Sequence, residues 1–223
     1  MSAAVANLRE RVAAGVSRSP VIAVVRHRDP FEAARQARFF AASRIELVEV
    51  TFTVPHATDL VRELLAERSS VGPPWIGMGT VTTPERARAA IAVGAEFVVT
   101  PNVDREVARI ASDAGLYLVV GALTPSEIVA AHATGADLIK IYPLPPVGGP
   151  AYLRVVREPL GDVGPMLAGG GFGIEEIPAY RAAGASAFGL GAPLVGADGE
   201  ETRARVDRAL ELARGGVSRA GEP

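Results

Sequence analysis

One lysine stands among the 23 basic residues of this 223-residue sequence: Lys140, the other 22 being arginines. A lysine can lose its proton when it is desolvated and then act as an amine nucleophile, whereas an arginine stays protonated. Lys140 lies in the apolar run Leu138–Tyr142, where strand geometry places it on one face with Leu138 and Tyr142. We expect an inward-facing amine that forms a Schiff base; a snorkelling or ion-paired lysine is the structural alternative.

Two carboxylates lie in a second apolar run, Ile45–Phe52: Glu46 at the strand entrance and Glu49 within the strand. The two-residue period of a strand places Glu49 on the same face as Leu47 and Thr51. Facing inward, Glu49 would accept and return protons around an imine, which is general acid–base catalysis. The alternative is a structural ion pair between Glu49 and Arg26.

Glycine-rich segments follow two later apolar runs, at Ala168–Gly173 and Gly189–Ala192. Glycine lets backbone N–H groups approach an anion closely, and a short helix that starts nearby adds a favourable dipole. Tight turns also use glycine, so the segments alone are a weak signal. In a barrel, the loops after strands seven and eight are the usual phosphate-binding place.

These residues need a scaffold, and eight short apolar or glycine-punctuated runs supply the strands. Each run is short enough for a strand and too continuous for one with a solvated face, as expected of parallel strands covered by helices. The expected strands are Val21–Val25, Ile45–Phe52, Trp75–Val81, Phe97–Thr100, Leu116–Ala122, Leu138–Tyr142, Met166–Gly170 and Ala187–Gly191.

Helical segments alternate with these strands. Pro behind an Asp or Thr cap marks the starts of helices at 31–40, 86–93 and 126–133. Eight such units predict a (β/α)8 TIM barrel in the α/β class, with an open doubly wound sheet as the competitor. We expect one domain over residues 1–223, an N-terminal helix over Ser2–Val16 that caps the barrel floor, and a frayed tail at 215–223.

Composition excludes several classes of function. The formal net charge of −2 and the pI near 6.0 give no general attraction to nucleic acid. No apolar run approaches the roughly 20 residues of a membrane span, and charged residues interrupt the segment where a signal peptide would need its apolar region. The sequence has no cysteine, which excludes thiol chemistry. We expect a cytoplasmic protein.

In this order, the short motifs of the chain resemble the class I pyruvate aldolases of the 2-keto-3-deoxy-6-phosphogluconate and 4-hydroxy-2-oxoglutarate family, including 2-keto-3-deoxy-6-phosphogalactonate aldolases. The similarity runs from about Val21 to Val195. The motifs that carry it are Ile22–Arg26, Val48–Thr51, Gly77–Val81, Val99–Asn102, Lys140–Pro143, Gly169–Gly170 and Gly189–Gly191.

The resemblance implies roles for particular residues. Lys140 would form the Schiff base and Glu49 would be the general acid and base. The pyruvyl pocket would be lined by Thr80, Pro101 and Tyr142, and the substrate's anionic groups would be bound by Arg26, Gly170, Gly171, Gly191 and Ala192. The resemblance also implies catalysis without a metal or other cofactor, and a homotrimer.

Three positions depart from the common pattern. Thr53 stands where many phosphogluconate-type members have an arginine, and together with Arg26 it favours the galactonate type. Ala168 stands where a threonine often precedes the paired glycines, and Ala192 replaces a hydroxyl residue in the loop after strand eight. The loss of these two hydroxyls weakens the case for a phosphorylated substrate.

The expected activity is cleavage of a 2-keto-3-deoxy-6-phospho sugar acid, of gluconate or galactonate type, to pyruvate and glyceraldehyde 3-phosphate. An aldolase of the same mechanism that acts on a non-phosphorylated keto acid such as 4-hydroxy-2-oxoglutarate is the alternative. Two other classes remain open: a metal-dependent barrel epimerase, because His27 and His56 lie near strand ends, and a sugar-acid binding protein without turnover. The expected partner is a small keto acid, with no nucleic acid and no membrane.

Overall fold

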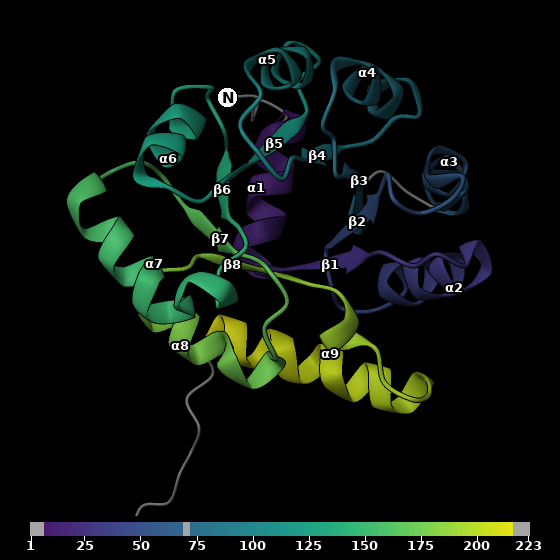
Figure 1. Cartoon of the computed structure of the whole chain (residues 1–223). Coiled ribbons are helices and arrows are strands. Elements are labelled where there is room, and N and C mark those ends of the chain that lie inside the picture. Colours follow the sequence, from purple (N-terminus) through teal and green to yellow (C-terminus); the bar gives the residue numbers. More distant parts are fainter. Residues whose placement is uncertain (1–6, 69–71, 216–223) are drawn as a thin grey trace, which may run out of the picture.

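Eight parallel strands close into a barrel in the computed structural model, which describes residues 7–68 and 72–215 (Figure 1). Each strand pairs with its neighbours in chain order, and β8 pairs with β1. The strands are β1 (Val21–Val25), β2 (Leu47–Thr51), β3 (Trp75–Gly79), β4 (Phe97–Val99), β5 (Tyr117–Ala122), β6 (Leu138–Ile141), β7 (Met166–Ala168) and β8 (Ala187–Leu190). The predicted (β/α)8 barrel is confirmed.

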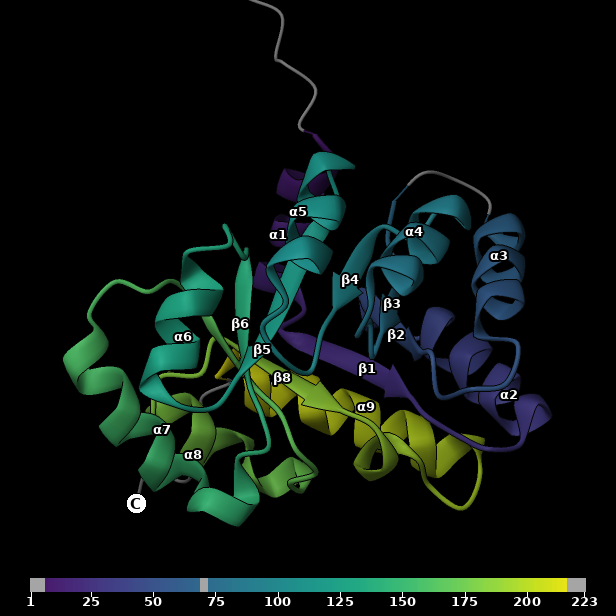
Figure 2. The ribbon, with the colours of Figure 1, turned by 45° about the horizontal axis from the view of Figure 1, so that its top comes forward.

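Helices surround the barrel on its outside (Figure 2). They are α2 (Pro30–Ala41), α3 (Ala57–Glu67), α4 (Pro84–Ala92), α5 (Arg105–Asp113), α6 (Pro125–His132), α7 (Gly149–Arg157), α8 (Ile177–Ala182) and α9 (Gly199–Arg214). The predicted starts of three of them are confirmed. Asp29, Thr83 and Thr124 each accept a hydrogen bond from the first turn of the helix that follows, with Pro at its first position.

The two faces of each strand belong to different cores. Leu47 and Leu138 pack with residues of the other strands in a cluster inside the barrel. Val48, Ile139 and Ile141 belong instead to the larger cluster between the strands and the helices. The alternation expected for β2 and β6 is therefore correct, and it places Glu49 and Lys140 on the inner side of the barrel.

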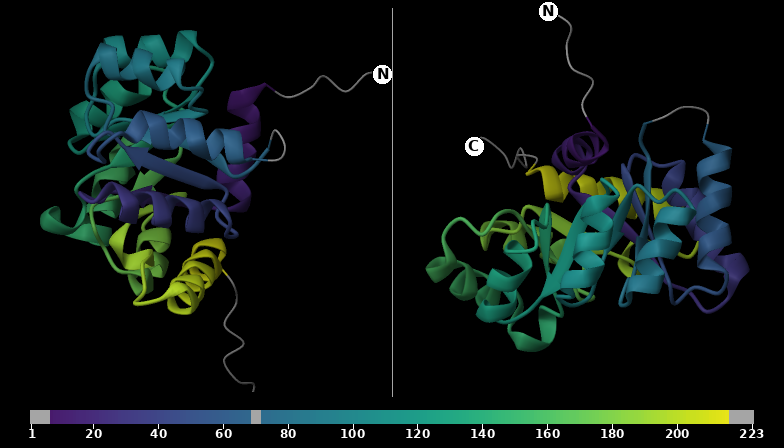
Figure 3. Two further views of the ribbon diagram at one scale, coloured as in Figure 1. Left: turned by 90° about the vertical axis from the view of Figure 1, so that its right-hand side faces the viewer. Right: turned by 90° about the horizontal axis from the view of Figure 1, so that it is seen from above.

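One end of the barrel is covered by α1 (Leu8–Arg18), which lies across it in Figure 3. Val12 and Val16 of this helix join the inner cluster, so they form the barrel floor. Asn7 and Glu10 form a capping box at the start of the helix, which runs two residues past the predicted end at Val16. The rest of the predicted start, at 2–6, and the predicted frayed tail, apart from Gly215, lie outside the described residues.

No helix in the described part of the chain is both long and apolar enough to span a membrane.

Two charged side chains, Arg68 and Glu96, form a buried ion pair at the base of the barrel. Arg68 lies 2.8 Å from a carboxylate oxygen of Glu96, and the two side chains are only 16% and 8% exposed. Glu96 also accepts a hydrogen bond from the backbone N–H of Ile76, and therefore joins β3 to the start of β4.

We expect Arg68→Met to lower the free energy of unfolding by about 3 kcal/mol, because Glu96 would keep a buried charge without its partner. Urea unfolding followed by circular dichroism measures this loss. Arg109→Met is the matched control, since Arg109 and Asp113 form an ion pair in which both side chains are 64% exposed. Its effect should stay within about 0.5 kcal/mol. Equal losses in the two variants would show that the burial of the Arg68 pair is not important for stability.

Candidate active site

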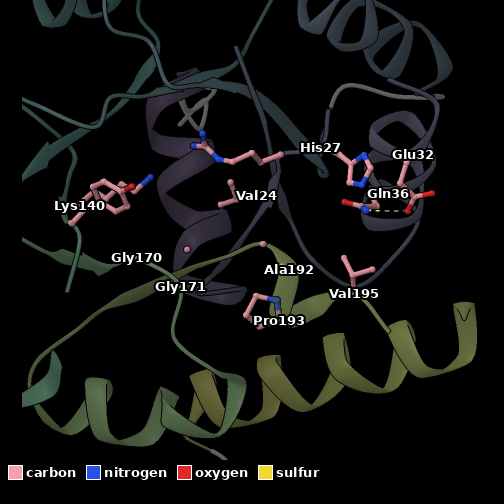
Figure 4. Close-up of a pocket in the computed structure, with 14 residues that line it drawn as sticks. Val24, His27, Glu32, Gln36, Lys140, Gly170, Gly171, Ala192, Pro193 and Val195 are labelled. Carbon is pink, nitrogen blue, oxygen red and sulfur yellow. Dashed lines mark hydrogen bonds between the residues drawn. The ribbon is translucent and has the colours of Figure 1, made fainter. Parts of the chain in front are cut away.

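A cavity of about 620 Å³ opens at the carboxyl ends of the strands, the end of the barrel opposite α1 (Figure 4). The side chains and glycines around it come from β1, β6 and β8, from the loops that follow β1, β6, β7 and β8, and from α2. Its lining is Val24, Arg26, His27, Glu32, Gln36, Lys140, Tyr142, Gly170, Gly171, Gly189, Gly191, Ala192, Pro193 and Val195.

Lys140 is half-buried and reaches this cavity from the end of β6. A side chain on Gly169, which directly follows β7, would press against Lys140, because a Cβ there would lie 3.2 Å from Lys140 Cε. The amine nitrogen lies 5.4 Å from the centre of the Tyr142 ring. Among the described residues, no carboxylate lies within ion-pair distance of it. The structure therefore presents a primary amine to the cavity with no acid partner.

Glu49 is buried on the inner face of β2, with 2% of the residue exposed. Its Oε1 atom has no hydrogen-bond partner among the described residues. The side chain lies over Gly79 of β3, where any Cβ would collide with the carboxylate. The alternative ion pair with Arg26 is not found among the ion pairs of the part of the chain that is described. A buried polar atom without a partner in the protein is rare, and a bound water molecule or a substrate can supply the missing partner.

Arg26 connects the cavity to two of the other predicted site residues. Its guanidinium donates hydrogen bonds to Thr53 Oγ1, at 3.3 Å, and to Thr80 Oγ1, at 3.1 Å. Thr53 Oγ1 also lies 2.7 Å from Thr51 Oγ1, which donates to the carbonyl of Val25. Thr53 and Thr80 do not line the cavity themselves, but they hold the guanidinium that does.

Thr80 has an unusual backbone conformation at the end of β3. Its φ of 58° lies in the left-handed region, which a β-branched residue rarely adopts. Its carbonyl accepts a hydrogen bond from Arg86 at 3.1 Å, and the same nitrogen of Arg86 donates to Thr82. The Arg86 guanidinium also lies over the Phe52 ring. Strained residues such as Thr80 gather at functional sites. The sequence patterns did not indicate that Arg86 holds Thr80 in this conformation.

The glycine segments bring backbone N–H groups to the cavity. Gly170 and Gly171 both have positive φ, at 125° and 86°. In the described part of the chain, neither N–H donates a hydrogen bond to the backbone. Ala192 begins a short 3-10 helix, Ala192–Leu194, beside them. This arrangement suits an anionic group, as expected for the loops after β7 and β8.

Of the eleven predicted site residues, seven line the cavity: Arg26, Lys140, Tyr142, Gly170, Gly171, Gly191 and Ala192. Glu49, Thr53, Thr80 and Pro101 do not. Pro101 follows β4, and its backbone carbonyl group lies against Gly121 of β5. The roles of all eleven residues stay predictions.

The prediction missed one end of the cavity, where Glu32 and Gln36 of α2 lie with Val195. Glu32 and Gln36 are four residues apart and joined by a hydrogen bond of 3.0 Å. Such an i,i+4 polar pair in the first turns of the helix that follows a barrel strand was a signal that could have found them. His27 also lines this end, and the described residues include no group of three His, Asp or Glu side chains that could hold a metal ion.

Most of the chain matches the model of a known protein family. The family model described as KDPG and KHG aldolase matches residues 12–209. The chain belongs to this family. The recognition of the family from sequence motifs is confirmed.

Individual relatives agree with the family. The chain is 33% identical over 163 residues to a 2-dehydro-3-deoxy-phosphogluconate aldolase of Pseudomonas aeruginosa, covering 73% of this chain and 71% of the relative. It is 29% identical to the 2-dehydro-3-deoxy-6-phosphogalactonate aldolase of Escherichia coli, covering 78% of this chain and 84% of the relative.

Solved structures give the same result. A crystal structure of a 4-hydroxy-2-oxoglutarate and phosphogluconate aldolase matches with a TM-score of 0.77 and 30% identity, covering 90% of this chain and 98% of the other. A structure described as native KDPGal matches with a TM-score of 0.76 and 28% identity, covering 88% and 95%. This aldolase is a carbon–carbon lyase, as the sequence predicted.

Proposed function

We propose that this aldolase cleaves a 2-keto-3-deoxy-6-phospho sugar acid to pyruvate and glyceraldehyde 3-phosphate through a Schiff base on Lys140. The observation that carries the proposal is the position of Lys140, the single lysine of the sequence, in the cavity wall without a carboxylate partner in the described residues. The named aldolases among the relatives support the substrate class.

The chemistry begins with attack of the Lys140 amine on the C2 ketone of the substrate. Loss of water from the carbinolamine gives a protonated imine, which accepts the electron pair of the C3–C4 bond when that bond breaks. The C4 hydroxyl loses its proton and becomes the aldehyde carbonyl. The enamine that remains is protonated at C3, and water releases pyruvate and the free lysine. Covalent catalysis of this kind replaces one difficult carbanion step with easier ones.

Glu49 is the group that we assign to the proton transfers, directly or through a water molecule. Its burial and its Oε1 atom without a partner support this role. A carboxylate held by hydrogen bonds to neighbouring side chains would be less available as a base. Its place over Gly79 on the inner face of the barrel keeps it on the same side of the sheet as Lys140.

The ends of the substrate are anionic, and two groups of donors suit them. Arg26, held by Thr53 and Thr80, supplies a guanidinium to the cavity. Gly170, Gly171, Gly191 and Ala192 lie where backbone N–H groups can bind a phosphate. Pro101 and Tyr142 complete the proposed walls of the pyruvyl pocket.

Pyruvate release, coupled to lactate dehydrogenase, tests the substrate class. We expect kcat/KM for a 6-phosphorylated 2-keto-3-deoxy sugar acid, as either the gluconate or the galactonate epimer, to exceed that for 4-hydroxy-2-oxoglutarate at least tenfold, because an anionic tail would gain hydrogen bonds to charged groups. Equal or reversed values would contradict the phosphorylated substrate and leave the Schiff-base chemistry standing.

A non-phosphorylated keto acid is the second candidate substrate. Ala168 and Ala192 favour it, since neither offers a hydroxyl to a phosphate. A structural relative named for both substrates shows that one aldolase is assigned to both. The same assay decides between the two candidates.

We also propose a homotrimer in the cytoplasm. A designed cage described as a fusion of symmetric oligomeric domains contains a chain that is 28% identical to this one, with a TM-score of 0.76, which supports an oligomer. Sedimentation equilibrium of the purified chain tests the trimer, and a monomer would contradict it.

A further inference from the structure

The cavity continues beyond the glycine loops to an end that the family resemblance does not explain. Figure 4 shows Lys140 on one side, then Gly170, Gly171 and Ala192, and His27, Glu32 and Gln36 on the far side. His27 follows Arg26 in the short connection from β1 to α2. A substrate bound covalently at Lys140, as proposed above, would extend its tail past the glycines and towards this end.

The hydrogen bonds of His27 determine which of its ring nitrogens can donate a hydrogen bond to a ligand. Its Nδ1 atom lies 3.1 Å from the backbone nitrogen of Asp29. An N–H can only donate, so Nδ1 accepts this bond and the proton of the neutral imidazole is on Nε2. The Asp29 carbonyl lies 3.3 Å from the same Nδ1 and is positioned to accept from it when the ring is charged. In both states Nε2–H remains a donor for a ligand.

The neighbouring carboxylate does not oppose an anion here. Glu32 forms a fork of two hydrogen bonds with Arg35, at 2.6 and 2.9 Å, and accepts one from Gln36. The hydrogen bond from Arg35, with that from Gln36, lowers the pKa of Glu32 to about 2, so it is ionised but neutralised by its partner. His27 therefore meets the cavity beside a neutral ion pair.

The glycine loops lack side-chain donors of their own. Ala168 is fully buried and Ala192 has only a methyl group, so the loops after β7 and β8 offer backbone N–H groups alone. His27 is a side-chain N–H donor that lines the same cavity as Gly170, Gly171 and Ala192.

We propose that His27 is a specificity-determining residue that binds the phosphate of the substrate, with its Nε2–H donating to a phosphate oxygen that the glycine amides contact from the other side. The inference rests on the proposed function and adds a residue to it. His27 supplies the side-chain donor that Ala168 and Ala192 do not provide, and it makes the enzyme distinguish a phosphorylated tail from a bare one.

The test compares His27→Ala with His27→Gln, whose amide nitrogen reaches the position of Nε2. We expect His27→Ala to raise KM for the 6-phosphorylated sugar acid about tenfold, the cost of one lost hydrogen bond to a charged group, and to leave kcat within threefold. His27→Gln should restore most of the loss. KM for the same sugar acid without phosphate should not change. His132→Ala, at the end of α6 and outside the cavity, is the control.

An unchanged KM for the phosphorylated substrate in His27→Ala would overturn the inference. An equal rise for the phosphorylated and the bare sugar acid would also overturn it, because the contact would then be with a part that both share. Reductive trapping of pyruvate separates this failure from that of the proposed function, since pyruvate has no phosphate. Trapping on Lys140 should persist in His27→Ala, and its absence from the wild type would refute the Schiff base itself.

Discussion

Lys140→Arg is expected to lose pyruvate release by a factor of about 10⁴ or more, the size of effect seen when a covalent nucleophile is removed. The arginine keeps a positive charge and a long side chain, but its guanidinium is always protonated and cannot form an imine with the C2 ketone. Electrostatic attraction of the keto acid is therefore retained, while covalent catalysis is removed. The coupled assay with the phosphorylated sugar acid measures the loss.

The loss of turnover in Lys140→Arg supports the Schiff base only if the variant folds like the wild type. Lys140 forms no ion pair within the described residues, and it lies at the open end of the barrel, so its replacement should leave the thermal transition almost unchanged. Arg154→Lys, on the surface helix α7, is the matched control because it makes the reverse exchange elsewhere, and it should keep full activity. Turnover in Lys140→Arg within tenfold of the wild type would contradict the Schiff base.

Glu49→Gln should lower kcat about 10²- to 10⁴-fold, the usual contribution of a general acid or base. The amide has the size of the carboxylate and fits over Gly79, but it cannot accept or return a proton. Because the carboxylate has an Oε1 atom without a partner, a neutral amide should not reduce stability. KM should change little, since binding does not depend on this proton transfer.

Thermal unfolding of Glu49→Gln distinguishes catalysis from structure. A variant that unfolds at the wild-type temperature and has lost turnover supports the acid–base role. A variant that fails to fold would support a structural role for the carboxylate, and one with full activity would assign the proton transfers to another group. Glu85→Gln, an exposed carboxylate in the first turn of α4, should match the wild type in both measurements.

The barrel could be predicted because its signals are local. Each strand lies within its predicted run, and the helix starts at Asp29, Thr83 and Thr124 follow from capping chemistry. The inward direction of Glu49 and Lys140 follows from the two-residue period of a strand. No contact between distant residues was needed for these conclusions.

The ends of the strands were predicted less well, and these ends hold the site. The run Trp75–Val81 continues in sequence, but β3 stops at Gly79 because Thr80 takes a left-handed conformation held by Arg86 and Arg26. The predicted run Met166–Gly170 also continues past its strand: β7 stops at Ala168, two residues before Gly170, whose φ is positive. An apolar or glycine-rich run does not show where its backbone leaves the sheet.

Contacts between distant segments also could not be predicted. Glu49 fits inside the barrel because Gly79 of the neighbouring strand leaves space, which depends on the register that pairs Thr51 with Gly79. The sequence alone indicates His27 only as a possible metal ligand. Its place beside α2 at the far end of the cavity depends on how that helix packs after β1.

The Schiff base is tested most directly by borohydride reduction in the presence of pyruvate, followed by intact mass and peptide mapping. The wild type should gain a single reduced pyruvyl group, on Lys140, and Lys140→Arg should gain none. Arg109→Lys adds a second lysine that is exposed, and it should still be labelled once, on Lys140. Labelling of the chain's terminal amine in place of Lys140, or no labelling of the wild type, would contradict a Schiff-base mechanism at this residue.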